Sequence, residues 1–136
     1  MVGGLALFVS METYHGSSFR SDRDLLVAAL QHARAQAMNN ICLGTGCTDG
    51  KPHGVYIQSD KYIVFQGGTY NSSDSNNAEF DSTITTTKTP STLEIVFSQL
   101  SGTTSCSNEC AVTLTDQSGH VSIATTTAEG RIYWSN

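Results

Sequence analysis

The sequence is short of charged residues, and of basic ones above all. Only 14% of its 136 residues are charged, seven are Lys or Arg, and the formal net charge is −5. General affinity for nucleic acid or anionic lipid needs many basic groups, so this composition disfavours both as partners. Hydrophobic residues still make up 38%, which excludes a disordered tail and leaves one domain with a real core.

No apolar run in the sequence is long enough to cross a bilayer, which takes about 20 residues. The chain does open on ten apolar residues, "MVGGLALFVS", before the polar "METYHGSSFRSDRD". Three interpretations are open: the end of a longer membrane-spanning helix, a helix buried in the domain core, and the core of a signal peptide. The third lacks a basic segment in front and a clean Ala-x-Ala site behind.

Recognisable catalytic motifs are missing as well. The chain has no G-x-S-x-G elbow, no nucleotide-binding glycine pattern and no internal repeat. Its histidines are scattered along the sequence: His15, His32, His53 and His120. Asp22 and Asp24 are expected to serve a helix N-terminus, whereas Asp74 and Asp81 would at most hold a calcium ion in a polar loop. We therefore expect no enzyme, no cofactor and no metal.

Four cysteines form two close pairs, Cys42 with Cys47 and Cys106 with Cys110. Their even number and short spacing favour two disulfides and an oxidising compartment. Two alternatives are open. One is a single zinc ion held by all four thiolates, because the spacings are near those of structural zinc sites. The other is free thiols.

The segment "SDRDLLVAALQHARAQAMNN" predicts an amphipathic helix over about 22–39. Ser21 and Asp24 have the spacing of a capping box, and Gly16 with its neighbouring serines is a poor continuation toward the N-terminus. One stripe of the helix carries the residues expected to pack: Leu26, Ala29, Leu30, Ala33 and Ala37. These side chains are small, so we expect close packing against a sheet, with His32 on the flank.

After Cys47 the sequence indicates about seven short strands. They are "HGVYIQ", "KYIVFQG", "TITTTKT", "TLEIVFSQL", "CAVTLTD", "HVSIATTT" and "GRIYW". Turns are expected at Ser59-Asp60 and at "DQSG", with Val112 and Leu114 facing Val121 and Ile123. The stretch "GGTYNSSDSNNAEFDS" is predicted as a polar surface loop that provides partner contacts. The predicted fold class is α+β.

Three segments, in their order along the chain, resemble the type IV pilin-like minor pilins and pseudopilins of the FimT/GspH group. They are "LLVAALQHARAQAMNN", "HGVYIQSDKYIVFQG" and "VSIATTTAEGRIYW". The resemblance implies an N-terminal helix over 1–40 packed on an antiparallel β domain over 41–136, with its strands in one sheet or in two small sheets. Residues 1–14 would be the remainder of the membrane or filament-core half, without its leader and first part, and 22–40 the amphipathic half.

The same resemblance implies a structural role rather than chemistry. The chain would be a subunit of a type IV pilus or a type II secretion pseudopilus, anchored and assembled through its helix. Its partners would be other pilin or pseudopilin subunits, and before assembly the bacterial inner membrane, with the β domain in the periplasm or on a filament. Gly16 would lie near the junction of the two helix halves, as a bend or as an ordinary loop glycine.

Two rival functions remain open. Some members of this group are associated with DNA uptake through a Gly-Arg-x-Arg motif, and the matching stretch here is Gly130-Arg131-Ile132-Tyr133, with tyrosine in place of the second arginine. Arg131, Tyr133 and Trp134 are then the candidate DNA contacts, although the simpler expectation is that Trp134 fills the sheet. The other rival is an unrelated secreted β-sandwich binding domain.

Overall fold

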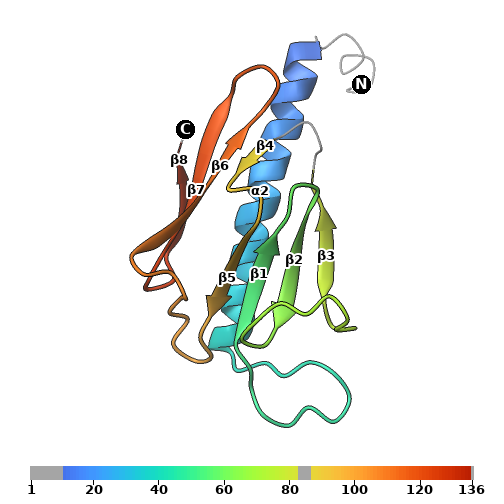
Figure 1. The fold of residues 1–136 in the computed structure, drawn as a ribbon, viewed down its shortest axis with the longest axis vertical. Coiled ribbons are helices and arrows are strands. Elements are labelled where there is room, and N and C mark those ends of the chain that lie inside the picture. Colours follow the sequence, from blue (N-terminus) through green and yellow to red (C-terminus); the bar gives the residue numbers. More distant parts are fainter. Residues whose placement is uncertain (1–10, 83–86, 136) are drawn as a thin grey trace, which may run out of the picture.

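The computed structural model describes residues 11–82 and 87–135, and over this part the chain is α+β as predicted (Figure 1). One helix, α2 (Met11–Met38), runs along two antiparallel sheets of four strands each. Figure 1 shows one sheet on either side of the helix axis. The loop that follows α2, with the Cys42–Cys47 pair, lies at the end of the molecule opposite the start of the helix. The apolar residues 1–10 lie outside the described residues.

Helix α2 begins well before the predicted start at residue 22, so the predicted capping box at Ser21 and Asp24 is wrong. Gly16 lies inside the helix rather than ending it, although glycine there costs about 1 kcal/mol. A tertiary contact explains the misassignment: Asp22 is buried and accepts hydrogen bonds from the β domain instead of capping a helix end. Within residues 11–82 and 87–135, no helix has an apolar stretch that would span a bilayer.

The packing stripe of the helix is as predicted. Each of its five members is at most 3% exposed: Leu26, Ala29, Leu30, Ala33 and Ala37. The alanines let α2 approach both sheets closely, and the stripe joins strand residues such as Ile57, Tyr62 and Phe97 in one core. His32 is exposed on the helix flank, also as predicted. Asn40, with a φ of 57°, ends the helix in the left-handed conformation.

The first sheet has the order β3-β2-β1-β5. Its strands are β1 (His53–Ile57), β2 (Lys61–Gln66), β3 (Ala78–Asp81) and β5 (Leu93–Phe97). The predicted hairpin around Ser59 and Asp60 is confirmed, with Gln58 donating its N–H to the carbonyl of Lys61. Strand β3 lies in a stretch predicted as loop. It is a short edge strand whose pairing with β2 is a long-range contact, invisible to local periodicity.

The second sheet has the order β4-β6-β7-β8. Its strands are β4 (Thr87–Thr89), β6 (Glu109–Thr115), β7 (Val121–Thr127) and β8 (Ile132–Ser135). The β6–β7 hairpin is confirmed, but the predicted facing residues are wrong. Val112 pairs with Ala124 and Leu114 with Ser122, so Val121 is 43% exposed instead of inward. The turn from Asp116 to His120 decides the register, and a shift by one residue exchanges the two faces of a strand.

A small second core covers the outer face of the first sheet. Ile63 and Phe65 are at most 1% exposed there, outside the main core cluster. The ring of Tyr70, from the long loop between β2 and β3, stacks on Tyr56 at 4.4 Å between centroids and meets the edge of Phe65. The predicted polar loop is therefore fastened to the sheet by an aromatic side chain. Gly54 leaves room for the Phe65 ring, which a Cβ at that position would meet at 2.6 Å.

Candidate functional site

A groove of about 650 Å³ opens between the outer flank of α2 and the turn that joins β7 to β8. Gln31, Arg34 and Met38 line it from the helix, at the three- and four-residue spacing of one helix face. Glu129, Arg131 and Ile132 line it from the turn and from the start of β8. The groove therefore brings the predicted Gly-Arg segment against helix residues that lie outside the packing stripe.

The β7–β8 turn depends on glycine at position 130. Gly130 has a φ of 93°, and its N–H donates to the carbonyl of Thr127. A Cβ built on Gly130 would clash with the carbonyl oxygen of Gly102 and approach the Nε of Arg34 to 3.0 Å. Only glycine allows both this conformation and this close approach.

The two arginines of the groove differ in their surroundings. The Nε of Arg34 is buried and has no hydrogen-bond partner among the described residues. The side chain of Arg131 is exposed, with its guanidinium carbon 5.5 Å from the centroid of the Tyr133 ring. A guanidinium group binds carboxylate or phosphate oxygens in pairs, so the chemistry of the groove suits an anionic group.

Two of the three candidate DNA contacts, Arg131 and Tyr133, lie together, and Trp134 lies apart from them. Trp134 is 42% exposed and lies under the guanidinium of Arg23, 3.7 Å from its ring centroid, so the prediction that it fills the sheet is wrong. The reason is position: β8 is an edge strand, and Ile132 is its residue against the core. Tyr133 is 41% exposed, and strand alternation sends it to the face opposite Trp134.

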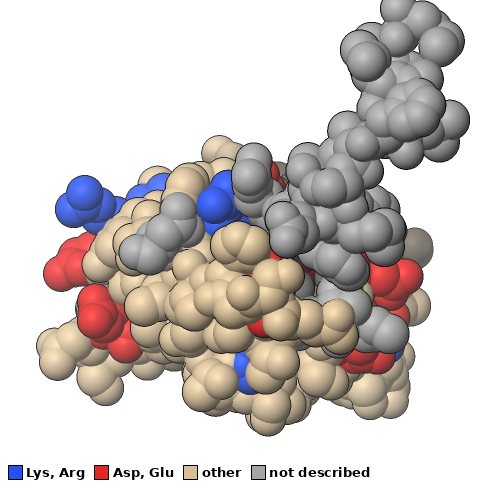
Figure 2. Space-filling model, turned by 90° about the horizontal axis from the view of Figure 1, so that it is seen from above, with Lys and Arg blue, Asp and Glu red and all other residues tan. Residues whose placement is uncertain are grey.

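Charge on the surface is mixed. Arg23 forms an ion pair with Asp24 at 3.1 Å, and Lys61 pairs with Glu79 at 3.2 Å. Figure 2, seen from the end where α2 begins, shows small separate groups of basic side chains with acidic ones near them and a mostly uncharged surface between. The face drawn there carries no continuous basic stripe of the kind that follows a nucleic acid backbone.

A buried polar cluster joins the helix to both sheets. The carboxylate of Asp22 accepts hydrogen bonds from the hydroxyls of Tyr62, at 3.2 Å, and Ser82, at 2.5 Å. The ammonium of Lys88, on β4, lies 3.8 Å from Asp22 and donates to Ser82 at 2.6 Å and to the carbonyl of Ser59 at 2.9 Å. The side chains of Asp22 and Lys88 are both 0% exposed. Sequence reasoning missed this cluster, since nothing local marks Lys88 as buried.

Burial decides the ionisation of this cluster. Desolvation lowers the pKa of Lys88 below its ordinary value, and the nearby carboxylate of Asp22 opposes that shift. Burial, followed by the charge of Asp22, raises the pKa of Tyr62, so its hydroxyl stays protonated and donates to Asp22. The cluster therefore links α2, β2 and β4, and each of its side chains has a hydrogen-bond or ion-pair partner.

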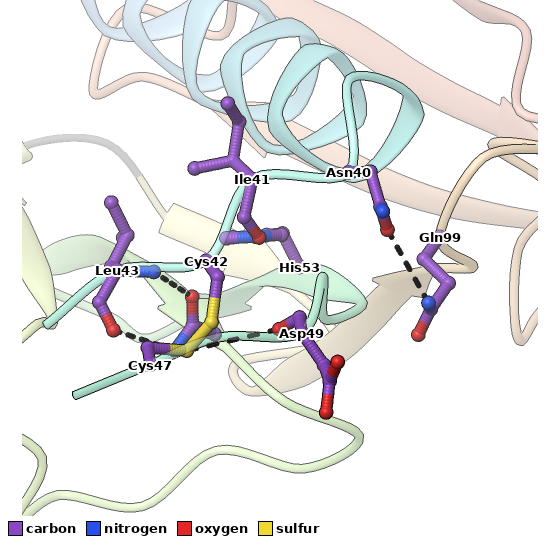
Figure 3. The surroundings of a disulfide bond; sticks show 9 residues. Asn40, Ile41, Cys42, Leu43, Cys47, Asp49, His53 and Gln99 are labelled. Carbon is purple, nitrogen blue, oxygen red and sulfur yellow. Dashed lines mark hydrogen bonds between the residues drawn. A yellow bond between two sulfur atoms is a disulfide. The ribbon is translucent and has the colours of Figure 1, made fainter.

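Both predicted disulfides are present, and they exclude the zinc and free-thiol alternatives. Cys42 and Cys47 are bonded with their Cα atoms 5.7 Å apart, and Cys106 and Cys110 with theirs 5.5 Å apart. The first closes the loop after α2 (Figure 3). There the main chain of Leu43 exchanges two hydrogen bonds with the amide side chain of Gln66, on β2.

His53 connects the disulfide loop to the core. Its ring is 0% exposed, and Nε2 donates a hydrogen bond to the carbonyl of Ile41 at 2.9 Å (Figure 3). The other ring nitrogen, Nδ1, is buried without a partner among the described residues. Burial lowers the pKa of His53, although the hydrogen bond to Ile41 works against that shift. The folded chain therefore holds this histidine neutral.

This histidine predicts a pH dependence. The unfolded chain takes up a proton at His53 below pH about 6.5 whereas the folded chain resists it, so stability falls as the pH drops from 6.5 toward the lower folded-state pKa. Urea unfolding at pH 7.5 and pH 5 should show this loss, and His53→Gln, which keeps a donor toward Ile41, should reduce it. His32→Gln, at an exposed position, is the control: the charge of His32 is the smallest contribution to the lowered pKa of His53, so most of the loss should remain. An identical loss in His53→Gln would contradict the assignment.

The acidic pair proposed for calcium is not brought together. Asp74 lies in the loop before β3, where it accepts a hydrogen bond from the N–H of Asn76 at 2.9 Å, and Asp81 ends β3 at the sheet edge. Among the residues that the structure describes, no group of three or more His, Cys, Asp or Glu side chains is arranged to hold a metal ion.

Comparisons with protein-family models, with curated proteins and with solved structures found no match for this chain.

Proposed function

We propose that this protein is a structural subunit of a filament, a pilin-like minor pilin or pseudopilin of the FimT/GspH kind. The supporting observation is a helix whose Ala/Leu stripe is fully buried against two antiparallel sheets and which follows directly on an apolar segment of the chain. The 28 residues of α2 are roughly 42 Å long, and they join the apolar residues 1–10 to the β domain.

Two apolar segments of the chain have different roles in this proposal, residues 1–10 and the helix stripe from Leu26 to Ala37. Residues 1–10 offer apolar surface to a membrane or to neighbouring subunits, while the stripe from Leu26 to Ala37 is already occupied by the chain's own sheets. Assembly through the first surface therefore leaves the β domain intact and displayed. Two disulfides, each spanning a few residues, suit an oxidising compartment such as the periplasm or the cell exterior.

The proposal predicts that the apolar segment directs membrane binding. We expect the chain to float with phospholipid vesicles in a density gradient, and the triple change Leu5→Asp, Leu7→Asp and Phe8→Asp to abolish flotation, because each buried apolar side chain contributes about 1.5–3 kcal/mol. The charge-matched control places three aspartates in the exposed loop, at Ser72, Ser73 and Ser75, and should float like the original chain. Equal flotation of both variants would contradict an anchoring role.

Assembly is tested in the cell that encodes the chain. An antibody against the β domain should detect the protein in the envelope fraction and in filaments sheared from the cells. Detection in the soluble cell interior alone would overturn the proposal. The competing DNA-uptake role is not favoured, because Trp134 lies on the face of β8 opposite Tyr133 and its neighbour Arg131, and the mixed surface charge offers few phosphate contacts.

A further inference from the structure

The groove between α2 and the β7–β8 turn has an arginine on each wall, so it suits an anionic partner. Arg34 lines the groove from α2, with its Nε buried against Gly130, and the exposed Arg131 lines the other wall. Glu129 lies on the same turn and offsets part of this charge. The two guanidinium groups together match one or two carboxylates, which guanidinium binds through paired hydrogen bonds.

Carboxylates are exposed at another place on the same molecule, the edge formed by the β1–β2 turn and the end of β3. Asp60 lies in the turn and Asp81 ends β3, and both are exposed. The N–H of Ser82 donates to the carbonyl of Asp60 at 2.8 Å, so the two aspartates are neighbours. Lys61 is nearby, but its ammonium pairs with Glu79. We call Asp60 and Asp81 the acidic edge.

The groove and the acidic edge of one molecule are too far apart to meet. The acidic edge adjoins Ser82, which bonds to Asp22, whereas Arg34 lies a little over three helical turns later, roughly 18 Å along α2. The two sites also belong to different sheets: β3 is an edge of the first sheet and β8 an edge of the second. Contact between them therefore requires two molecules.

We propose that the groove of one copy binds the acidic edge of the next copy, with Arg34 and Arg131 donating hydrogen bonds to the carboxylates of Asp60 and Asp81. This inference rests on the proposed function, since it adds a second contact between subunits of a filament, besides the apolar residues 1–10. Two different surfaces meet in such a contact, so it is heterologous and leaves a free groove at one end and a free acidic edge at the other. Repetition then produces an open chain of subunits rather than a closed dimer.

The experiment is a charge exchange on the full chain. Copies labelled with donor or acceptor dyes at Ser118→Cys, on the exposed β6–β7 hairpin, are mixed on phospholipid vesicles at low salt and their energy transfer is measured. Arg131→Glu alone and Asp81→Arg alone should each weaken association, on the order of tenfold. The double variant, in which every copy carries both changes, should recover it. Both positions are exposed, so the variants are expected to fold, as circular dichroism will check.

Asp49→Arg is the matched control, because it makes the same charge change on an exposed residue of the disulfide loop and should leave energy transfer unchanged. Single variants that associate like the original chain, or a double variant no better than the singles, would overturn the inference. Flotation of the same samples separates this outcome from failure of the proposed function. If the chain does not bind vesicles, self-association of the same variants is compared by sedimentation in solution. There too, weaker association of each single variant and recovery in the double variant would support the inference.

Discussion

Replacing Asp22 with alanine is expected to lower the free energy of unfolding by about 3–5 kcal/mol. The substitution removes the carboxylate that accepts hydrogen bonds from Tyr62 and Ser82 and leaves the ammonium of Lys88 buried without its counter-charge. Lys88 has to lose its proton or draw in water, and either change loosens the contact between α2 and β4. Urea denaturation of the original and variant chains, followed by circular dichroism, measures the difference.

Asp24→Ala is the control for this prediction. Asp24 is two residues away on the same helix, but its side chain is 65% exposed and pairs with Arg23 at the surface, so the loss should stay within about 1 kcal/mol. A second variant, Asp22→Leu with Lys88→Met, removes both charges and should recover much of the stability lost in Asp22→Ala. If Asp22→Ala costs no more than Asp24→Ala, the cluster does not fasten the helix as we infer.

Gly130→Ala is expected to destabilise the chain by about 2–5 kcal/mol, because two costs add. A non-glycine residue at a φ of 93° is strained by about 1–2 kcal/mol, and the added methyl group is forced against the Gly102 carbonyl, which costs about 1–3 kcal/mol more. Movement of the turn would also displace Arg131 relative to Arg34, so the groove should lose its shape. Thermal unfolding measures the first effect.

Gly119→Ala separates these two costs. Gly119 has a nearly equal φ of 88°, but a Cβ there meets nothing within 4 Å. Its substitution should therefore cost only the backbone strain, about 1–2 kcal/mol. Equal destabilisation at positions 119 and 130 would mean that the close approach of the β7–β8 turn to Gly102 contributes nothing.

Local patterns predicted much of the architecture. The apolar stripe from Leu26 to Ala37, the hairpin at Ser59 and Asp60, and both cysteine pairs are found as expected. Each depends on residues close together in sequence, whose spacing alone decides which face is apolar, where the chain turns and which thiols can meet. The groove is different: its Gly-Arg segment was noticed, but its helix wall, with Arg34, was not.

What the sequence by itself determined is the α+β class, the buried face of the helix and the disulfide pairing, because periodicity and short spacings encode these features. Only the tertiary structure decided the burial of Asp22 with Lys88, the pairing of β3 as an edge strand and the exposure of Trp134 at the end of β8. The residues next to a polar side chain in the sequence do not show which distant residue it will contact in the fold. Whether an aspartate caps a helix or lies buried beside a lysine depends on which distant strand the fold brings against it.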